Sequence, residues 1–346
     1  MFANIIQMMI LQQRISAFIT LGQNWLSTIQ NNTPEWQELC RMARVHNAWF
    51  EKENIQHQFT NLAYLLTQEN LTEFTKNYTF DTEPKNVGII AAGNIPIVAF
   101  HDLMCVLLAG HNVLLKLSSD DQLLMRYVVH QLQTIEPQFN ITVTERLNTI
   151  DAVIATGSNN SARYFDYYFG KYPHIIRKNR NSVAVLTGNE TNEELTALAT
   201  DICAYFGLGC RNVSKVYLPK GYDLDNLFNV LFPYQHMVNN QKYGNNYDYN
   251  RALLMMKQVP FLENGFMVLK EDTVIATPVA ILNYEYYTDI TALETQLAQH
   301  KHDLQCIVAQ AGVLHSTPTL AFGTTQQPSL IDYADDVDTL SFLSKL

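Results

Sequence analysis

Short apolar runs alternate with helical patterns between residues 86 and 186, and this alternation constrains the fold more than any other feature of the sequence. Four runs have the length and composition of buried strands: 86–92 (NVGIIAA), 112–117 (NVLLKL), 151–155 (DAVIA) and 182–186 (SVAVL). The first three are followed by breaks that contain Gly or Ser and then by helix-like segments. This order predicts an α/β fold in which a parallel sheet carries helices on both faces.

The segments between these strands have apolar residues at the three- and four-residue spacing of helices. We expect helices over 97–109, 118–135 and 159–169. Pro96 fits the first position of the first helix, and Ser118 or Ser119 is the expected cap of the second.

The sequence before residue 81 and after residue 190 predicts three further structural regions. Residues 1–80 have a helical pattern, and a second alternation of helices and strands runs from 191 to 314. The tail carries three aspartates and is expected to be solvated or to contact another subunit. The expected organisation is an N-terminal helical region (1–80), a first α/β domain (81–190 with part of 315–346), a second α/β domain (191–314) and the tail (322–346).

Charge and hydropathy exclude several classes of protein. The net charge of −10 disfavours binding to nucleic acid, because a phosphate backbone would be repelled. The most apolar stretch, 95–115, contains His101, Asp102 and His111, so we expect no membrane span. No basic residue precedes the apolar run at the start of the chain, which argues against a secretory signal. We therefore expect a soluble, cytoplasmic protein.

The five cysteines form neither a disulfide framework nor a zinc site, because they are widely spaced and no C-x-x-C pair occurs. No metal is expected. Cys105 and Cys203 lie in apolar helical patterns, and Cys40 and Cys306 have no glycine neighbours, so all four are interpreted as core residues.

Cys210 differs from the others because it lies in the sequence FGLGCRN. Gly209 would let a ligand approach the backbone closely, and the cation of Arg211 could lower the pKa of the thiol. Two interpretations stay open on the residues alone: a catalytic nucleophile, or a small side chain packed in the core.

Polar residues follow three of the predicted strands. Asn94 comes after the first and Lys116 ends the second, while Thr156-Gly157-Ser158 follows the third. The carboxyl ends of parallel strands meet at one edge of a sheet, where ligands bind. Each residue also has a structural interpretation, since Asn94 and Ser158 could be helix caps and Lys116 could extend into solvent.

Taken in order, these motifs resemble the aldehyde dehydrogenase superfamily. Residues 86–121 are similar to its cofactor-binding core, 156–158 to its T-G-S turn, and Gly209-Cys210 to its nucleophile, while 277–309 is similar to its late G-P-V segment. Within the superfamily, RKNRNSVAVL, KYGNNYDYN and DYADDVDTLSFL resemble the acyl-CoA reductases related to the fatty-acid reductase subunit of bacterial luminescence systems.

The resemblance implies two Rossmann-like α/β domains, the first binding NADP and the second carrying the thiol. It implies that Cys210 attacks the thioester of an acyl-CoA, that Asn94 and the backbone N–H of Cys210 stabilise the oxyanion, and that NADPH reduces the acyl-enzyme to a fatty aldehyde. Gly209 and Arg211 would lie against the substrate. The residues implied in cofactor binding are Lys116, Ser118, Ser119, Thr156, Gly157 and Ser158.

Departures from the superfamily pattern refine this expectation. Ser119 replaces a Glu that bonds the adenosine ribose, which favours NADPH over NADH. The catalytic Glu of hydrolytic members has no counterpart in 176–180 (IRKNR), which favours CoA chemistry over oxidation to an acid. Val274 replaces the Glu that binds the nicotinamide ribose.

Other functions stay open at this point. They are an acyl-phosphate reductase or an aldehyde-oxidising dehydrogenase on the same scaffold, a cysteine hydrolase or acyltransferase, and a non-catalytic binding protein. The Asn- and Tyr-rich segment 233–250, which includes His236 and Lys242, is either a lid or wall of the acyl pocket, or a polar surface loop or subunit contact. The superfamily commonly forms dimers or tetramers, so a homo-oligomer is expected.

Overall fold

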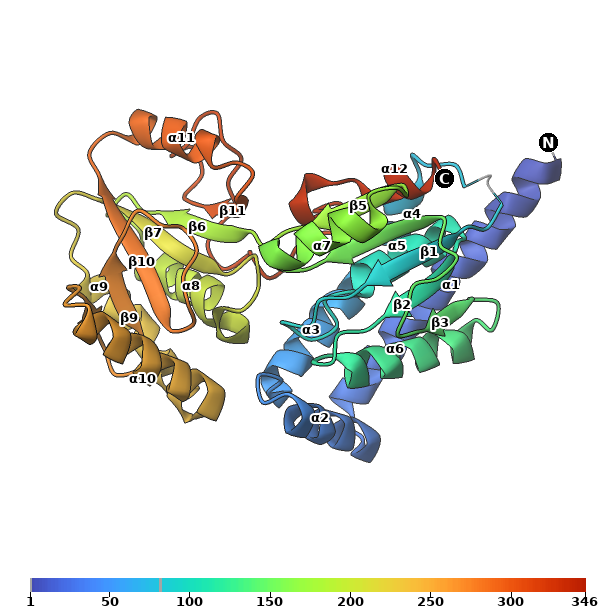
Figure 1. Ribbon diagram of the computed structural model, residues 1–346, viewed down its shortest axis with the longest axis horizontal. Coiled ribbons are helices and arrows are strands. Elements are labelled where there is room, and N and C mark those ends of the chain that lie inside the picture. Colours follow the sequence, from blue (N-terminus) through green and yellow to red (C-terminus); the bar gives the residue numbers. More distant parts are fainter. Residues whose placement is uncertain (1, 81–82) are drawn as a thin grey trace. The chain divides into compact units, whose positions relative to one another are not determined.

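The computed structural model describes residues 2–80 and 83–346, which form two compact units (Figure 1). The first comprises Met1–Lys178 with Ser329–Leu346, and the second comprises Asn179–Pro328. The division falls earlier than the expected boundary at 190. The reason is that the strand Asn181–Val185 (β6) pairs with strands of the second unit and with none of the first.

The N-terminal region is helical, as the sequence predicts. Its apolar faces pack around aromatic side chains, with the ring centroids of Trp25 and Phe59 4.8 Å apart and those of Trp36 and Phe59 5.2 Å apart. Pro34 occupies the first turn of one helix, and Thr33 caps it by accepting a hydrogen bond from Trp36 N. The helices are α1 (Phe2–Gln30), α2 (Pro34–His46), α3 (Lys52–Leu65) and α4 (Gln68–Thr75).

The first unit contains a five-stranded parallel sheet with the order β3-β2-β1-β4-β5. This confirms the predicted α/β class. The short strands β3 and β5 were not predicted. The elements are β1 (Asn86–Ile90), α5 (Phe100–Ala109), β2 (Asn112–Lys116), α6 (Gln122–Ile135), β3 (Ile141–Val143), β4 (Ala152–Thr156), α7 (Asn159–Phe169) and β5 (His174–Arg177).

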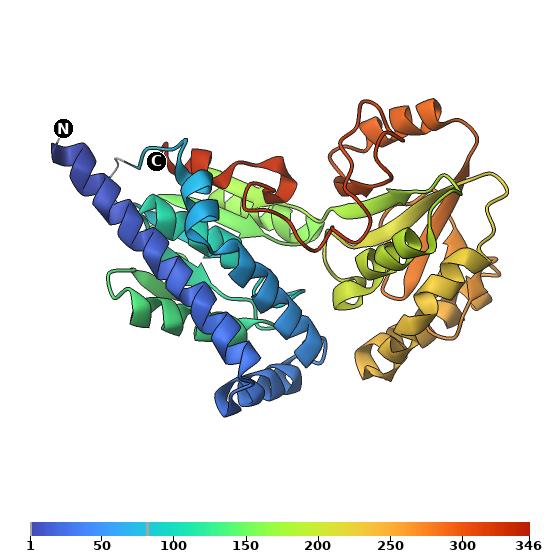
Figure 2. The same ribbon diagram turned by 180° about the vertical axis from the view of Figure 1, so that it is seen from behind.

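Helices cover both faces of this sheet (Figures 1 and 2). α5 and α6 lie on one face, and α1 packs against both of them. α7 lies on the other face, where Phe165 and Phe169 pack on a small cluster around Val153.

The second unit contains a six-stranded sheet with the order β11-β6-β7-β10-β9-β8, parallel except for the pair β8–β9. Leu293 and Leu297 of α11 pack on one face against Val183 and Tyr217, while α8, α9 and α10 lie on the other (Figure 1). The elements are α8 (Asn192–Cys203), β7 (Val213–Pro219), α9 (Asp225–Leu231), α10 (Gln241–Met256), β8 (Leu262–Glu263), β9 (Val268–Glu271), β10 (Ile281–Tyr287), α11 (Ile290–Gln299) and β11 (Leu304–Val308).

Two segments are more ordered than a solvated tail or a polar loop would be. The tail is not simply solvated, because α12 (Thr339–Leu343) packs on α5 with Leu340 and Leu343 fully buried. Residues 233–250 are not a loop. They belong to the 3₁₀ helix η2 (Phe232–Asn239) and to α10, which Asn240 caps by accepting hydrogen bonds from the N–H groups of Lys242 and Tyr243.

Within the described part of the chain, no helix combines the length and the apolar character needed to cross a bilayer.

Candidate functional site

Three strand ends meet at the carboxyl edge of the first sheet. Ile90 at the end of β1 pairs with Lys116 of β2 on one side and with Ala155 of β4 on the other. The segments that begin at Ala91, Leu117 and Gly157 therefore leave adjacent strands at the same edge. The chain order reverses between β1 and β4, which is where open α/β sheets bind ligands.

The turns after β1 and β2 touch each other at Gly93. A Cβ atom built on Gly93 would lie 2.5 Å from Oγ of Ser118, so only glycine allows this approach. The exposed Asn94 follows directly. The expected helix start at Pro96 was wrong, because α5 begins only at Phe100. Asn94 lies in a turn before the helix rather than at its cap.

Ser118 and Ser119 lie in the turn before α6 and do not cap it, contrary to expectation. The helix begins at Gln122, and its N-cap is Asp121. His46, at the end of α2, donates a hydrogen bond of 3.0 Å from Nε2 to the carbonyl of Ser119. The N-terminal helices thus hold the turn that the resemblance assigns to the adenosine ribose. Lys116 is exposed at the end of β2.

The T-G-S turn joins β4 to the N-terminus of α7. Ser158 caps the helix, because its Oγ accepts a hydrogen bond of 3.2 Å from Ser161 N. Gly157 N donates to the carbonyl of Arg177 on β5, at 3.3 Å. A Cβ atom on Gly157 would lie 2.9 Å from both Ser161 and Phe165. A phosphate could bind here because N–H groups converge at the start of a helix.

Two features at this edge could contact an anionic ligand. Lys116 adds a cation, and the start of α7 carries backbone N–H groups. In residues 2–80 and 83–346, no group of three or more His, Cys, Asp or Glu side chains could hold a metal ion.

Cys210 lies in the second unit, in the turn before β7, and its side chain is exposed. The other four cysteines are buried, which confirms their interpretation as core residues. Burial raises the pKa of Cys40 to about 11 and also raises the pKa values of Cys105 and Cys203, so these thiols stay protonated and unreactive at neutral pH.

The backbone before Cys210 is strained. Tyr205, Phe206 and Gly207 have φ values of 51°, 59° and 74°, which place three successive residues in the left-handed region. Each of the two aromatic residues costs about 1–2 kcal/mol in this conformation. Packing compensates, since Tyr205 is buried and the ring centroid of Phe206 lies 5.8 Å from that of Tyr243. Such strain clusters at functional sites.

The turn of Cys210 is tied to the neighbouring strands. Ser182 Oγ donates to the carbonyl of Cys210 at 3.0 Å and accepts from the N–H of Cys306 at 3.1 Å. Arg211, predicted to lie near the thiol of Cys210, also donates from Nη1 to Sγ of Cys306 at 3.3 Å. Gly209 is half-buried beside the thiol.

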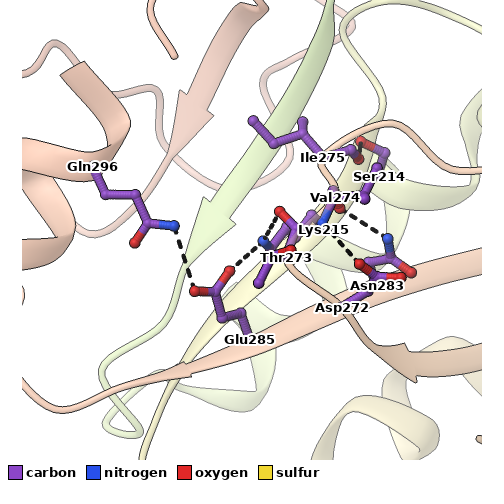
Figure 3. A network of polar contacts seen from close by, with 9 residues as sticks. All are labelled: Ser214, Lys215, Asp272, Thr273, Val274, Ile275, Asn283, Glu285 and Gln296. Carbon is purple, nitrogen blue, oxygen red and sulfur yellow. Dashed lines mark hydrogen bonds and ion pairs between the residues drawn. The ribbon is translucent and has the colours of Figure 1, made fainter. Parts of the chain in front are cut away.

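A second polar network holds the segment that precedes β10 (Figure 3). The successive carbonyls of Thr273, Val274 and Ile275 each accept a hydrogen bond of 2.8 Å from a side chain of β7 or β10. Val274 is 53% exposed, so an apolar side chain projects from this fixed segment. The three donors are Lys215, Asn283 and Ser214.

Sequence reasoning missed Lys215, which is fully buried and paired with Glu285. Its Nζ also lies 4.6 Å from the ring centroid of Tyr217. The available signal was a lone lysine within the apolar strand VSKVYL, because such a cation needs a specific partner. His236 and Lys242 lie exposed on η2 and α10, and nothing in the structure assigns them a role.

Comparisons with known proteins found a family profile and solved structures that match the chain. A family profile described as "Acyl-CoA reductase (LuxC)" matches residues 8–227. No curated protein matches the chain. Among solved structures, aldehyde dehydrogenase 21 from Physcomitrella patens, in complex with the reaction product succinate, has a TM-score of 0.66 at 11% identity, covering 97% of this chain and 84% of that one.

Two further structures show the same fold. The Mycobacterium tuberculosis aldehyde dehydrogenase complexed with NAD+ has a TM-score of 0.62 at 12% identity, with 87% of this chain and 73% of that chain covered. The NAD+ complex of the Bacillus cereus aldehyde dehydrogenase has a TM-score of 0.59 at 13% identity, with 86% and 71% covered.

Proposed function

The chain belongs to the acyl-CoA reductase (LuxC) family, and on this basis we propose that Cys210 accepts the acyl group of an acyl-CoA and releases it as an aldehyde. The observation that carries the proposal is the exposure of this thiol. Cys210 alone among the five cysteines is exposed, and it lies in a glycine turn inside the matched region.

The first step is acyl transfer to sulfur. The thiolate of Cys210 attacks the carbonyl carbon of the thioester, the new C–S bond forms, and the bond to the CoA sulfur breaks as CoA leaves as a thiolate. The N–H of Cys210 donates to the oxyanion that forms in between, and losing one such donor typically costs about 3 kcal/mol of barrier. The side-chain amide of Asn94 is the second proposed donor, and the sequence resemblance supports that role.

The second step reduces the acyl-enzyme. A nicotinamide dinucleotide, when bound, supplies the hydride that this step needs. Lys116 would hold the adenosine ribose or its 2′-phosphate, with Ser118 and Ser119 beside it, and residues 156–158 would hold the pyrophosphate. The hemithioacetal on Cys210 then collapses, the C–S bond breaks, and the thiolate is regenerated as the aldehyde leaves.

The residues favour reduction over hydrolysis. Hydrolysis of the acyl-enzyme requires a general base to activate water. The thiol of CoA ionises more easily than water, so exchange of the acyl group between Cys210 and CoA needs no such base. The stretch 176–180, which lacks a carboxylate, begins at the end of β5. The carboxylate of Asp102 lies 2.6 Å from Arg177 in a buried ion pair, so it is engaged and does not act as that base.

NADPH is the proposed cofactor rather than NADH. Ser119 is exposed and stands in place of the superfamily's Glu, whose carboxylate would repel a 2′-phosphate. Lys116, at the end of β2 just before it, supplies a cation that would attract this phosphate. We also propose that the protein works as a homo-oligomer and that fatty acyl-CoA is its substrate, both on the basis of the resemblance.

The experiment is a turnover assay with a panel of acyl-CoAs and, in parallel, acyl phosphates. Loss of NADPH absorbance, release of CoA and formation of aldehyde are followed together. Cys210→Ala is expected to abolish all three signals, while the matched control Cys40→Ala retains them. Activity of Cys210→Ala at the parental level would disprove the assignment of the nucleophile, and use of acyl phosphates alone would disprove the CoA substrate.

A further inference from the structure

Asn212, two residues after the proposed nucleophile, is 3% exposed and makes hydrogen bonds with every part of its side-chain amide. Its Nδ2 donates to the carbonyl of Asp201 at 3.0 Å and to that of Ala204 at 2.9 Å. Its Oδ1 accepts from the N–H of Gly209 at 2.8 Å. A buried amide with both N–H groups and its oxygen engaged has a single orientation.

These bonds connect the end of α8 to the turn that carries Cys210. The last carbonyls of α8 have no donor within the helix, and the left-handed residues 205–207 turn the chain away at this point. Asn212 donates to one of these carbonyls, that of Asp201, and to the carbonyl of Ala204, which directly follows the helix. Its backbone N–H also donates to the carbonyl of Gly209 at 3.1 Å, which closes a turn over Cys210 and Arg211.

We propose that Asn212 is a positioning residue for Cys210, which fixes the turn between α8 and β7 so that the thiol is presented in one orientation. The effect of Asn212 on catalysis rests on the proposed function, whereas its effect on the conformation of the turn does not. Gly209 and Asn212 form the two ends of the turn, and two hydrogen bonds join them, one to Oδ1 of Asn212 and one from its backbone N–H.

The substitution Asn212→Ala removes the donors to Asp201 and Ala204 and the acceptor for Gly209. Displacing a reacting group by about 1 Å lowers rates by up to about 100-fold. We expect the rate of acyl transfer to Cys210 to fall at least about ten-fold, while the KM for NADPH is unchanged. The control is Asn250→Ala, since Asn250 is another buried asparagine of the second unit, whose Nδ2 donates to the carbonyl of Val279.

A direct probe of the thiol separates this inference from the proposed reaction. Alkylation of Cys210 by iodoacetamide, followed by mass spectrometry of the peptide, requires no acyl-CoA. In Asn212→Ala, which adds no charge, the thiol leaves its fixed position in the turn, so the pH midpoint and the rate of alkylation both differ from those of the parent. A merely structural role would lower the melting temperature without changing either.

Hydrogen exchange in the parent protein keeps the inference testable if the variants fail to fold. The N–H of Gly209 is expected to exchange at least about ten-fold more slowly than in an unstructured peptide, because Asn212 accepts its hydrogen bond. Three results would each overturn the inference: unprotected exchange at Gly209, parental alkylation kinetics in Asn212→Ala, or equal effects of Asn250→Ala. Absence of acyl-CoA turnover in the parent would overturn only the proposed function.

Discussion

Nη1 of Arg177 lies 2.6 Å from Oδ2 of Asp102, and both side chains are more than nine-tenths buried. The same guanidinium donates from Nη2 to Oγ1 of Thr339 at 2.9 Å, and the carbonyl of Arg177 accepts from Gly157 N. One residue of β5 thus connects the start of α5, the C-terminal helix α12 and the T-G-S turn. Asp102 is therefore structural in the first unit.

Removing one partner of this pair is expected to destabilise the protein strongly. In Asp102→Ala the guanidinium of Arg177 stays buried without its counter-charge, which typically costs about 3–5 kcal/mol. Urea denaturation monitored in the first unit measures this change. The control is Arg41→Ala, which removes an ion pair with Glu38 at the surface and is expected to leave the midpoint unchanged. Equal midpoints for Asp102→Ala and the parent would contradict the prediction.

Asp121 at the N-cap of α6 gives a prediction about pH. Burial raises the pKa of this carboxyl well above its usual value, although the backbone N–H of Ile97 partly offsets the shift. Among the residues that the structure describes, none forms a hydrogen bond of normal geometry with either oxygen. The folded protein therefore holds the proton more tightly than the unfolded chain. The stability that this proton contributes is complete below pH about 4 and is lost as the pH rises toward the folded pKa.

Asp121→Asn carries no titratable proton and has nearly the same shape. We expect the variant to be more stable than the parent at pH 7, with an advantage that grows between pH 4 and pH 7. Urea midpoints across this range measure the difference. An advantage that shrinks as the pH rises would show that the carboxyl is ionised in the folded protein.

The sequence predicted the regular parts of the fold well, because burial of apolar strands leaves a periodic signal. Strands near 86–92 and 112–117 and the helix Asn159–Phe169 lie where expected. β3 and β5 were missed because they have only three and four residues, too few to show a pattern. Residues 96–99 were predicted as the start of a helix, because apolar residues continue through them, but they lie in a turn before α5.

The residues that position the candidate sites through hydrogen bonds were harder to predict than the candidate site residues themselves. Glycine neighbours singled out Cys210, and strand ends singled out Lys116. Arg177 meets Asp102 across 75 residues of sequence and Thr339 across 162. Such pairings depend on tertiary packing and leave no local trace. Asn212 lies only two residues from Cys210, but its partners at the end of α8 can be identified only from the three-dimensional structure.

Ser119→Glu tests the proposed cofactor preference. A carboxylate at this exposed position of the β2–α6 turn would repel a 2′-phosphate and could accept hydrogen bonds from unmodified ribose hydroxyls. We expect the KM for NADPH to rise at least about ten-fold, which corresponds to about 1.4 kcal/mol, while the KM for NADH falls or stays constant. Steady-state kinetics with both nucleotides measure the ratio. The control Ser119→Gln has a similar volume without the charge and should keep the parental preference.

Lys215 gives the last prediction, which concerns the segment held above β7 and β10 (Figure 3). In Lys215→Met, Glu285 loses its cation and the carbonyl of Thr273 loses its donor. The cost is expected to be smaller than for Asp102→Ala, because the side chain of Glu285 is 24% exposed and can be solvated. Replacing both partners in Lys215→Met/Glu285→Leu should recover much of the loss, since neither charge is then left alone. Urea denaturation of the parent, the two single variants and the double variant measures the coupling. A double variant with the summed loss of the two single variants would show that Lys215 and Glu285 do not stabilise each other.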